Sequence, residues 1–108
     1  MTVSDLASNN AVTVVCMPDK DRVIRGVYIG DLLSWVMGRA KEDNAWITIM
    51  SNSNTVAVAS LADVSCVILA EGVTLESSVI ETAIQNNINI FSTNLTAYEA
   101  AVMLSKFE

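Results

Sequence analysis

Two adjoining stretches decide the fold of this chain: Gly-Asp-Leu-Leu-Ser-Trp-Val-Met-Gly-Arg-Ala at 30–40 and Ala-Trp-Ile-Thr-Ile at 45–49. Asp31 is a favourable helix N-cap, because its carboxylate can accept hydrogen bonds from the free N–H groups of a first helical turn. The apolar residues that follow predict a helix over 31–40. The second stretch is short, β-branched and aromatic, so it predicts a buried strand over 46–50.

The predicted helix is apolar on almost every side, because Ser34 is the only polar residue in the run 32–37. Such a helix is buried on more than one face. One sheet can cover only one of those faces, so we expect the remainder to meet another subunit, with Trp35 and Met37 at the interface. The alternative is that Trp35 packs under the loop Met17–Asp21 of the same chain.

Strands and helices are predicted to alternate along the rest of the chain. The other predicted strands lie at 12–16, 66–69 and 88–91, and a β-rich run lies at 23–29. A short first helix is predicted to be capped by Ser4 and to end at Ser8. Two further helices are predicted: one at 75–86, capped by Thr74 and ended by Asn86-Asn87, and one at 96–106, which begins with a capping box of Thr96 and Glu99.

The segment Thr55–Leu61 is compatible with either a strand or a helix. Its valines alternate with small residues, as in a strand, but Asn54 is also a plausible N-cap. We favour the helix, because parallel strands on both sides of this segment need a crossover connection between them.

This alternation predicts a single α/β domain over 1–108, a small layered fold with a mainly parallel or mixed central sheet flanked by helices. The strands at 66–69 and 88–91 should be parallel and joined by a right-handed crossover. A chain of 108 residues with 52% hydrophobic and 17% charged residues can bury a core of this kind without disulfides or metals.

The two opening stretches, together with Asn-Thr-Val-Ala-Val-Ala at 54–59 and the turn from Val67-Ile68-Leu69 to Gly72, resemble the DRTGG domain, a small regulatory module. The resemblance extends over 26–106, and the tract from Asp63 onward is similar to the N-terminal domain of HPr kinase/phosphorylase. It implies a fold like that N-terminal domain. The phosphate-binding loop Gly-x-x-x-x-Gly-Lys-[Ser/Thr] is absent from the sequence, so no kinase activity is implied.

The contexts in which the resembled family occurs imply regulation or assembly. The module is sometimes set between nucleotide-sensing CBS domains of a regulated pyrophosphatase, and it also occurs alone or beside iron–sulfur, hydrogenase-linked proteins. The resemblance therefore implies a small-molecule or nucleotide ligand, a partner enzyme, or both.

The charge distribution argues against binding to nucleic acids or anionic membranes. The chain carries a net charge of −6, and five of its six basic residues lie within 20–41. Both kinds of binding depend on clusters of Lys and Arg that are absent from the rest of the chain.

Neither a membrane span nor a secretory signal is expected. The longest apolar tract, Cys66–Ala70, is too short to span a bilayer. A secretory signal needs a basic residue near its start, and 1–10 has none. We therefore expect a cytoplasmic protein.

Catalysis has little support in the sequence. The chain has no histidine, so the candidate nucleophiles Cys16, Cys66, Ser34, Ser51 and Thr48 lack the commonest activating base. The two cysteines lie in Val-rich, strand-like runs without a CxxC pair, so we expect buried, reduced and unreactive thiols. We predict no catalytic residue, no metal and no cofactor, with a minimal enzyme lacking histidine as an alternative.

Four polar turns provide a binding hypothesis. They lie at 30–31, 51–54, 71–72 and 92–94, where predicted strands end. In parallel α/β sheets, ligands bind beyond the carboxyl ends of the strands. The candidate ligand-binding residues are Gly30, Asp31, Ser34, Thr48, Asn52, Asn54, Glu71, Gly72 and Thr93. The alternative is that the four turns only cap helices.

The sequence therefore predicts a non-catalytic regulatory module that self-associates as a homodimer or a higher homo-oligomer. It would sense a small polar ligand, with a nucleotide as one candidate, or dock onto a partner enzyme, for which the resemblance suggests a hydrogenase-linked or iron–sulfur protein. The first alternative is an oligomerisation adaptor that binds no ligand.

Overall fold

Five short strands form one open sheet in the part of the chain that the computed structural model describes, residues 1–107. The strands are β1 (Thr13–Cys16), β2 (Val27–Ile29), β3 (Ala45–Thr48), β4 (Cys66–Leu69) and β5 (Ile90–Ser92), and the helices are α1 (Val3–Ala7), α2 (Leu33–Arg39), α3 (Ser53–Ala62), α4 (Ser77–Gln85) and α5 (Ala97–Ser105). The order across the sheet is β1-β5-β4-β3-β2.

The sheet is mixed. Strands β2, β3, β4 and β5 pair in parallel, whereas β1 pairs with β5 in the antiparallel direction. The alternation of strands and helices confirms the predicted α/β class, and the parallel pairing of β4 with β5 agrees with the sequence prediction. The β-rich run at 23–29 contributes only its last three residues to the sheet, because Val23 forms no more than an isolated bridge with Thr2.

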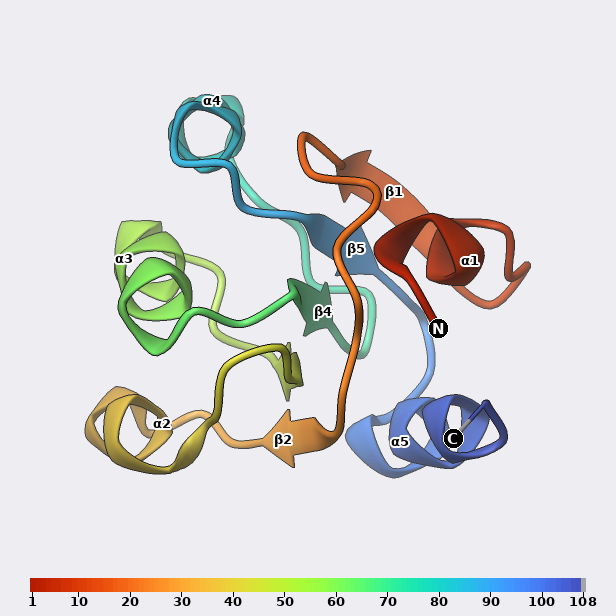
Figure 1. Cartoon of the computed structure of the whole chain (residues 1–108). Coiled ribbons are helices and arrows are strands. Elements are labelled where there is room, and N and C mark those ends of the chain that lie inside the picture. The colour runs from red at the N-terminus through yellow and green to blue at the C-terminus, as the bar shows by residue number, and fades with distance from the viewer. Residues whose placement is uncertain (108) are drawn as a thin grey trace.

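Two helical layers enclose the sheet, as Figure 1 shows: α2, α3 and α4 cover one face, and α1 and α5 cover the other. Successive residues of a strand point to opposite faces. Trp46 and Val67 therefore pack against the three-helix layer, while Ile47 and Ile68 pack against the two-helix layer. Trp46 is fully buried, which confirms the predicted buried strand.

The segment 17–26 carries the chain from β1 to β2, past the amino ends of the parallel strands (Figure 1). Its backbone is held by the buried polar side chains of Ser65 and Asn89, which directly precede β4 and β5. The Asn89 side-chain amide donates to the carbonyls of Asp19 and Ser65, at 2.9 Å each, and the Ser65 hydroxyl donates to the carbonyl of Val23. This long connection places β1 and β2 at opposite edges of the sheet.

Arg22 joins the same segment to two turns. Its guanidinium forms ion pairs with Asp43 at 3.2 Å and with Asp63 at 2.8 Å. Burial of the guanidinium opposes its charge, but the hydrogen bonds to Asp63 and Asp43 outweigh this effect and raise the pKa of Arg22. Both aspartates have left-handed backbone conformations, with φ of 69° and 55°.

Helix α2 departs from the sequence prediction at its start. Its N-cap is Leu32, which provides no side-chain hydrogen bond, so the assignment of Asp31 as the cap is wrong. The Asp31 carboxylate instead accepts hydrogen bonds from the Thr48 hydroxyl at 2.8 Å and from the Ile49 N–H at 3.0 Å. A contact with a neighbouring strand has replaced the local cap.

The expectation that this helix is buried on more than one side is also wrong for a single chain. Only Val36 is buried, and Trp35 and Met37 are 53% and 51% exposed. Trp35 is therefore not covered by the loop Met17–Asp21. Instead, the guanidinium of Arg39 stacks on the Trp35 ring in a cation–π contact, 3.8 Å from the ring centroid.

The remaining helices agree with the sequence in type but differ in their first residues. The segment with two possible assignments is helical, as favoured, although its cap is Asn52 and not Asn54. The caps predicted for the first helix and for 75–86 are wrong: α1 starts after Thr2, in a capping box with Asp5, and α4 starts after Glu76, which provides no side-chain hydrogen bond. The capping box on α5 is confirmed.

Candidate functional site

The four polar turns lie at one edge of the sheet, because the carboxyl ends of parallel strands share an edge. Gly30-Asp31 follows β2, 51–54 follows β3, 71–72 follows β4, and 92–94 covers the end of β5 and the turn beyond it. Strand β1 runs the other way, so its first residues, and not its last, reach this edge beside β5. The edge divides into two parts with different character.

The part of the edge beyond β2 and β3 is held together by its own polar groups. Thr48 donates to Asp31 and accepts from the N–H of Met50 at 3.1 Å. Asn52 caps α3 by accepting from the N–H of Asn54 at 3.0 Å. These polar groups serve the turns and the helix start, as the alternative interpretation of the turns expects.

The remaining candidates in this part are also structural or peripheral. The N–H of Gly30 donates to the carbonyl of Ile47 at 3.2 Å, and the carbonyl of Gly30 accepts from the Trp46 indole at 2.9 Å. Ser34 lies exposed on α2. The structure therefore does not bring Gly30 and Ser34 into a common recess with the other candidates.

The part beyond β4 and β5 contains a hollow with a volume of about 430 Å³. It lies within the usual range of small-molecule pockets, roughly 300–1,000 Å³. We call it the β4–β5 hollow, and its lining residues are Asn10, Ala11, Thr13, Gly72, Val73, Thr74, Ser92, Thr93, Asn94 and Leu95. They come from three segments that are far apart in sequence.

Hydrogen bonds fix those three segments to one another. The N–H of Gly72 donates to the carbonyl of Thr93 at 2.9 Å, and the N–H of Glu71 donates to the carbonyl of Leu95 at 2.9 Å. The buried hydroxyl of Thr93 donates to the carbonyl of Ala11 at 2.6 Å. The walls of the hollow are therefore formed by the folded chain itself, before any ligand arrives.

Gly72, the one glycine that lines the hollow, has a backbone conformation that favours glycine. Its φ is +74°, in the left-handed region, and a Cβ built on it would lie 3.2 Å from Oδ1 of Asn94. A side chain here would be strained by the backbone and would also push against the neighbouring turn. Glu71, directly before it, also has positive φ, at 58°.

Of the nine predicted ligand-binding residues, the structure places two in the wall of this hollow, Gly72 and Thr93, with Glu71 beside them. The prediction missed the segment Asn10–Thr13, because the direction of β1 cannot be read from its sequence. Thr74 and Asn94 are not among the predicted residues either, although Asn94 lies in one of the four polar turns.

Neither cysteine has the environment of a nucleophile. Cys16 and Cys66 are both buried and unpaired with each other. Burial raises the pKa of Cys16, and it raises the pKa of Cys66 to about 12. Because the thiolate is the reactive form, both thiols are held in their unreactive state at neutral pH.

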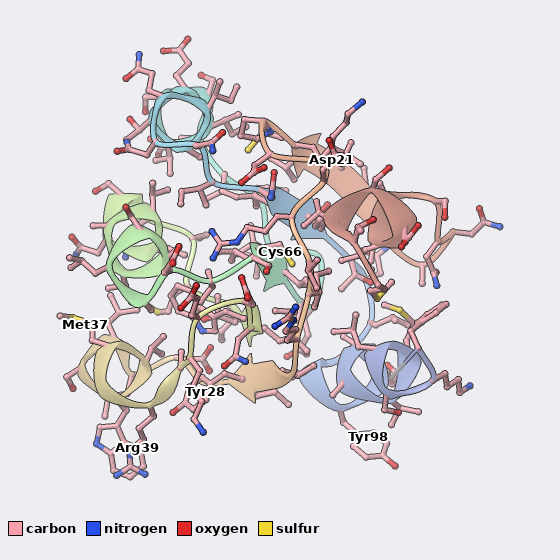
Figure 2. All side chains as sticks on the ribbon, in the orientation of Figure 1. Asp21, Tyr28, Met37, Arg39, Cys66 and Tyr98 are labelled. Carbon is pink, nitrogen blue, oxygen red and sulfur yellow. The ribbon has the colours of Figure 1, made fainter. Side chains whose placement is uncertain are left out.

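A second, smaller hollow of about 240 Å³ lies between α3 and α4. Its lining residues are Ser53, Val56, Ala57, Ser60, Leu61, Thr82 and Asn86. On the same helical layer, Figure 2 shows Met37 on the side of α2 away from the sheet and Arg39 extending downward from the same helix. Tyr98 projects from α5, in the other helical layer.

Neither a membrane-spanning helix nor a group of metal ligands occurs among the described residues 1–107. Within this range, no helix has the length and the apolar character that a membrane crossing requires. Nor do three or more of their acidic or cysteine side chains converge in a group that could hold a metal ion.

Comparison with solved structures identifies a similar fold. The chain is similar to the CBS and DRTGG domains of the regulatory region of Clostridium perfringens pyrophosphatase, a crystal structure in complex with the activator diadenosine tetraphosphate. The two share 16% sequence identity with a TM-score of 0.69, and the match covers 94% of this chain and 48% of the other. The chain thus spans about half of that structure, and the likeness concerns the fold.

Two sequence comparisons gave different outcomes. The comparison with curated proteins finds no match. The family model described as the DRTGG domain, in contrast, matches residues 5–107, which is almost the whole chain. This chain therefore belongs to the DRTGG domain family.

Proposed function

We propose that this domain is a non-catalytic, cytoplasmic regulatory module that binds a small polar ligand in the β4–β5 hollow. The observation that supports it is the hollow itself, a recess with fixed walls at the carboxyl edge of the sheet, where α/β folds bind ligands. The regulatory setting of the similar pyrophosphatase region agrees with this role. The absence of any histidine, together with the two protonated thiols, argues against catalysis.

The signal would pass to a second copy of the domain or to a partner enzyme. Trp35 and Met37, exposed on α2, are the proposed contact residues, since Trp and Met are enriched at the cores of interfaces. The resemblance to the HPr kinase N-terminal domain, and to modules beside hydrogenase-linked and iron–sulfur proteins, suggests the kind of partner. The second candidate function, an adaptor that binds no ligand, is favoured by the same exposed surface.

Amide NMR spectra of the labelled domain would test the ligand. We expect at least one neutral or charged metabolite from a mixed library of nucleosides, sugars, amino acids and nucleotides to shift the signals of residues 72–74 and 92–95. Thr13→Tyr should abolish the shifts by filling the hollow, whereas Val14→Tyr should not, because Val14 is exposed on the same strand and does not line the hollow. A library without any binder at these residues would favour the adaptor.

A further inference from the structure

The polar side chains of the β4–β5 hollow are all uncharged. Its wall presents the amides of Asn10 and Asn94 and the hydroxyls of Thr13, Thr74 and Ser92. Amides and hydroxyls both donate and accept hydrogen bonds, so this wall suits ligands that carry hydroxyl, amide or ring-nitrogen groups. The same wall has no group that could neutralise an anion.

The cations of the chain lie elsewhere. Five of the six basic residues lie within 20–41, in the segment that crosses the amino ends of the strands, in α2 and in the loop that follows it. Arg22, among them, is already paired with two aspartates. Phosphate sites in proteins use Arg, Lys or the free N–H groups of a helix start. None of the residues that line the hollow is basic.

Helix α5, which follows the hollow, does not replace those cations. The N-terminal end of α5 is occupied by its own capping box, in which Glu99 accepts from the N–H of Thr96 at 3.0 Å and Thr96 accepts from the N–H of Glu99 at 3.2 Å. Helix α4 begins directly after Glu76. The start of α5 is therefore occupied by a carboxylate of the chain itself, whereas the exposed Glu76 precedes α4 without capping it.

Apolar side chains complete the recess. Ala11, Val73 and Leu95 also line it. A ring with an apolar face and polar edges matches such a combination, because the face can contact the aliphatic groups while the edges bind amides and hydroxyls.

From these features we infer that the β4–β5 hollow selects an uncharged ligand of the nucleoside class, a flat heterocyclic ring bearing several hydroxyl or amide groups, over its phosphorylated counterparts. This inference rests on the proposed function, since it names the class of ligand that the same site binds. The wall of the hollow suits the nucleoside part of a nucleotide, but it has no basic side chain for the phosphates.

Titration of the intact domain with adenosine and with AMP, followed by amide NMR, tests the inference. We expect adenosine to shift the signals of residues 72–74 and 92–95, and AMP to bind the same residues at least about ten-fold more weakly. Thr13→Tyr should abolish the adenosine shifts, and Val14→Tyr should preserve them. Thr74→Lys should strengthen AMP binding, whereas Asn54→Lys, which adds the same charge beyond β3, should not.

Each other result would overturn the inference. Equal or tighter binding of AMP at these residues would disprove the preference for uncharged ligands while leaving the proposed function intact. Adenosine shifts that survive Thr13→Tyr would place the ligand outside the hollow. If neither compound binds, the nucleoside class is wrong, and the mixed library described above then decides separately whether the hollow binds any ligand.

Discussion

At the scale of single residues, Trp46 should carry one of the largest contributions to stability. It is fully buried, and its indole N–H donates to the carbonyl of Gly30 at 2.9 Å. Trp46→Ala should lower the free energy of unfolding by about 3–5 kcal/mol, as large-to-small core substitutions do. Urea denaturation followed by circular dichroism measures the loss. A change of only a few tenths of a kcal/mol would contradict the core position of this side chain.

Asp31 stabilises a strand end and not a helix start. Asp31→Ala should lower the free energy of unfolding by about 1–2 kcal/mol, because the Thr48 hydroxyl and the Ile49 N–H lose a charged acceptor. A double-mutant cycle with Thr48→Val measures the contact itself, and we expect a coupling of about 1 kcal/mol. Additive effects of the two substitutions would instead indicate that the hydrogen bond between them contributes nothing.

The thiol of Cys66 makes stability depend on pH in the alkaline range. Its pKa is about 12 in the folded protein, so it stays protonated where the same thiol of the unfolded chain ionises, near pH 9. The unfolded state then binds fewer protons than the folded state, and stability falls as pH rises above about 9. We expect the wild type to lose about 1 kcal/mol more than Cys66→Ala between pH 8 and 10. Parallel losses in both proteins would contradict this.

At the scale of elements, the start of α3 offers a matched pair of asparagines. The Asn52 side chain accepts from the N–H of Asn54, whereas Asn54 itself is exposed within the first turn. Asn52→Ala should therefore lower the free energy of unfolding by about 1 kcal/mol, the typical value of a lost N-cap, and Asn54→Ala should change it by no more than about 0.5 kcal/mol. Equal losses in the two variants would disprove the assignment of the cap.

Element types could be predicted from the sequence more reliably than element starts. The β-branched run at 66–69 and the capping box of Thr96 with Glu99 are local signals, and the structure follows both. The start of α2 could not be predicted in the same way. The best local cap, Asp31, was also within reach of a strand that follows it in the sequence, and the hydrogen bonds to that strand were formed instead.

At the scale of the whole molecule, the candidate site could be predicted only in part. Parallel strands bring the turns at 71–72 and 92–94 to one edge, and the alternation of strands and helices was enough to predict that edge. The contribution of Asn10–Thr13 depends on the antiparallel direction of β1. That direction follows from the long segment 17–26, whose attachments to Ser65 and Asn89 are tertiary and leave no periodic pattern in the sequence.

Assembly is the prediction that belongs to the molecule as a whole. We expect a dimer at micromolar concentration, related by a two-fold axis, in which α2 contributes Trp35 and Met37 to the buried surface. The stacked Arg39 guanidinium holds the Trp35 ring in place before association, which limits the entropy lost on binding. A buried interface tryptophan contributes about 2 kcal/mol or more, so the loss of one copy weakens a dimer roughly 30-fold, and a substitution removes the side chain from both subunits.

Sedimentation equilibrium on three proteins tests this assembly. Trp35→Glu should be monomeric with an unchanged circular dichroism spectrum, because Trp35 is half exposed in the single chain and the substitution leaves the core intact. Tyr98→Glu is the matched control: it places the same charge on an aromatic residue that is 76% exposed, but on α5 in the other helical layer (Figure 2), so we expect it to dimerise like the wild type. A wild type that remains monomeric at tens of micromolar would exclude the adaptor alternative. If Tyr98→Glu is monomeric and Trp35→Glu still dimerises, the interface lies on the other face of the sheet, at α5.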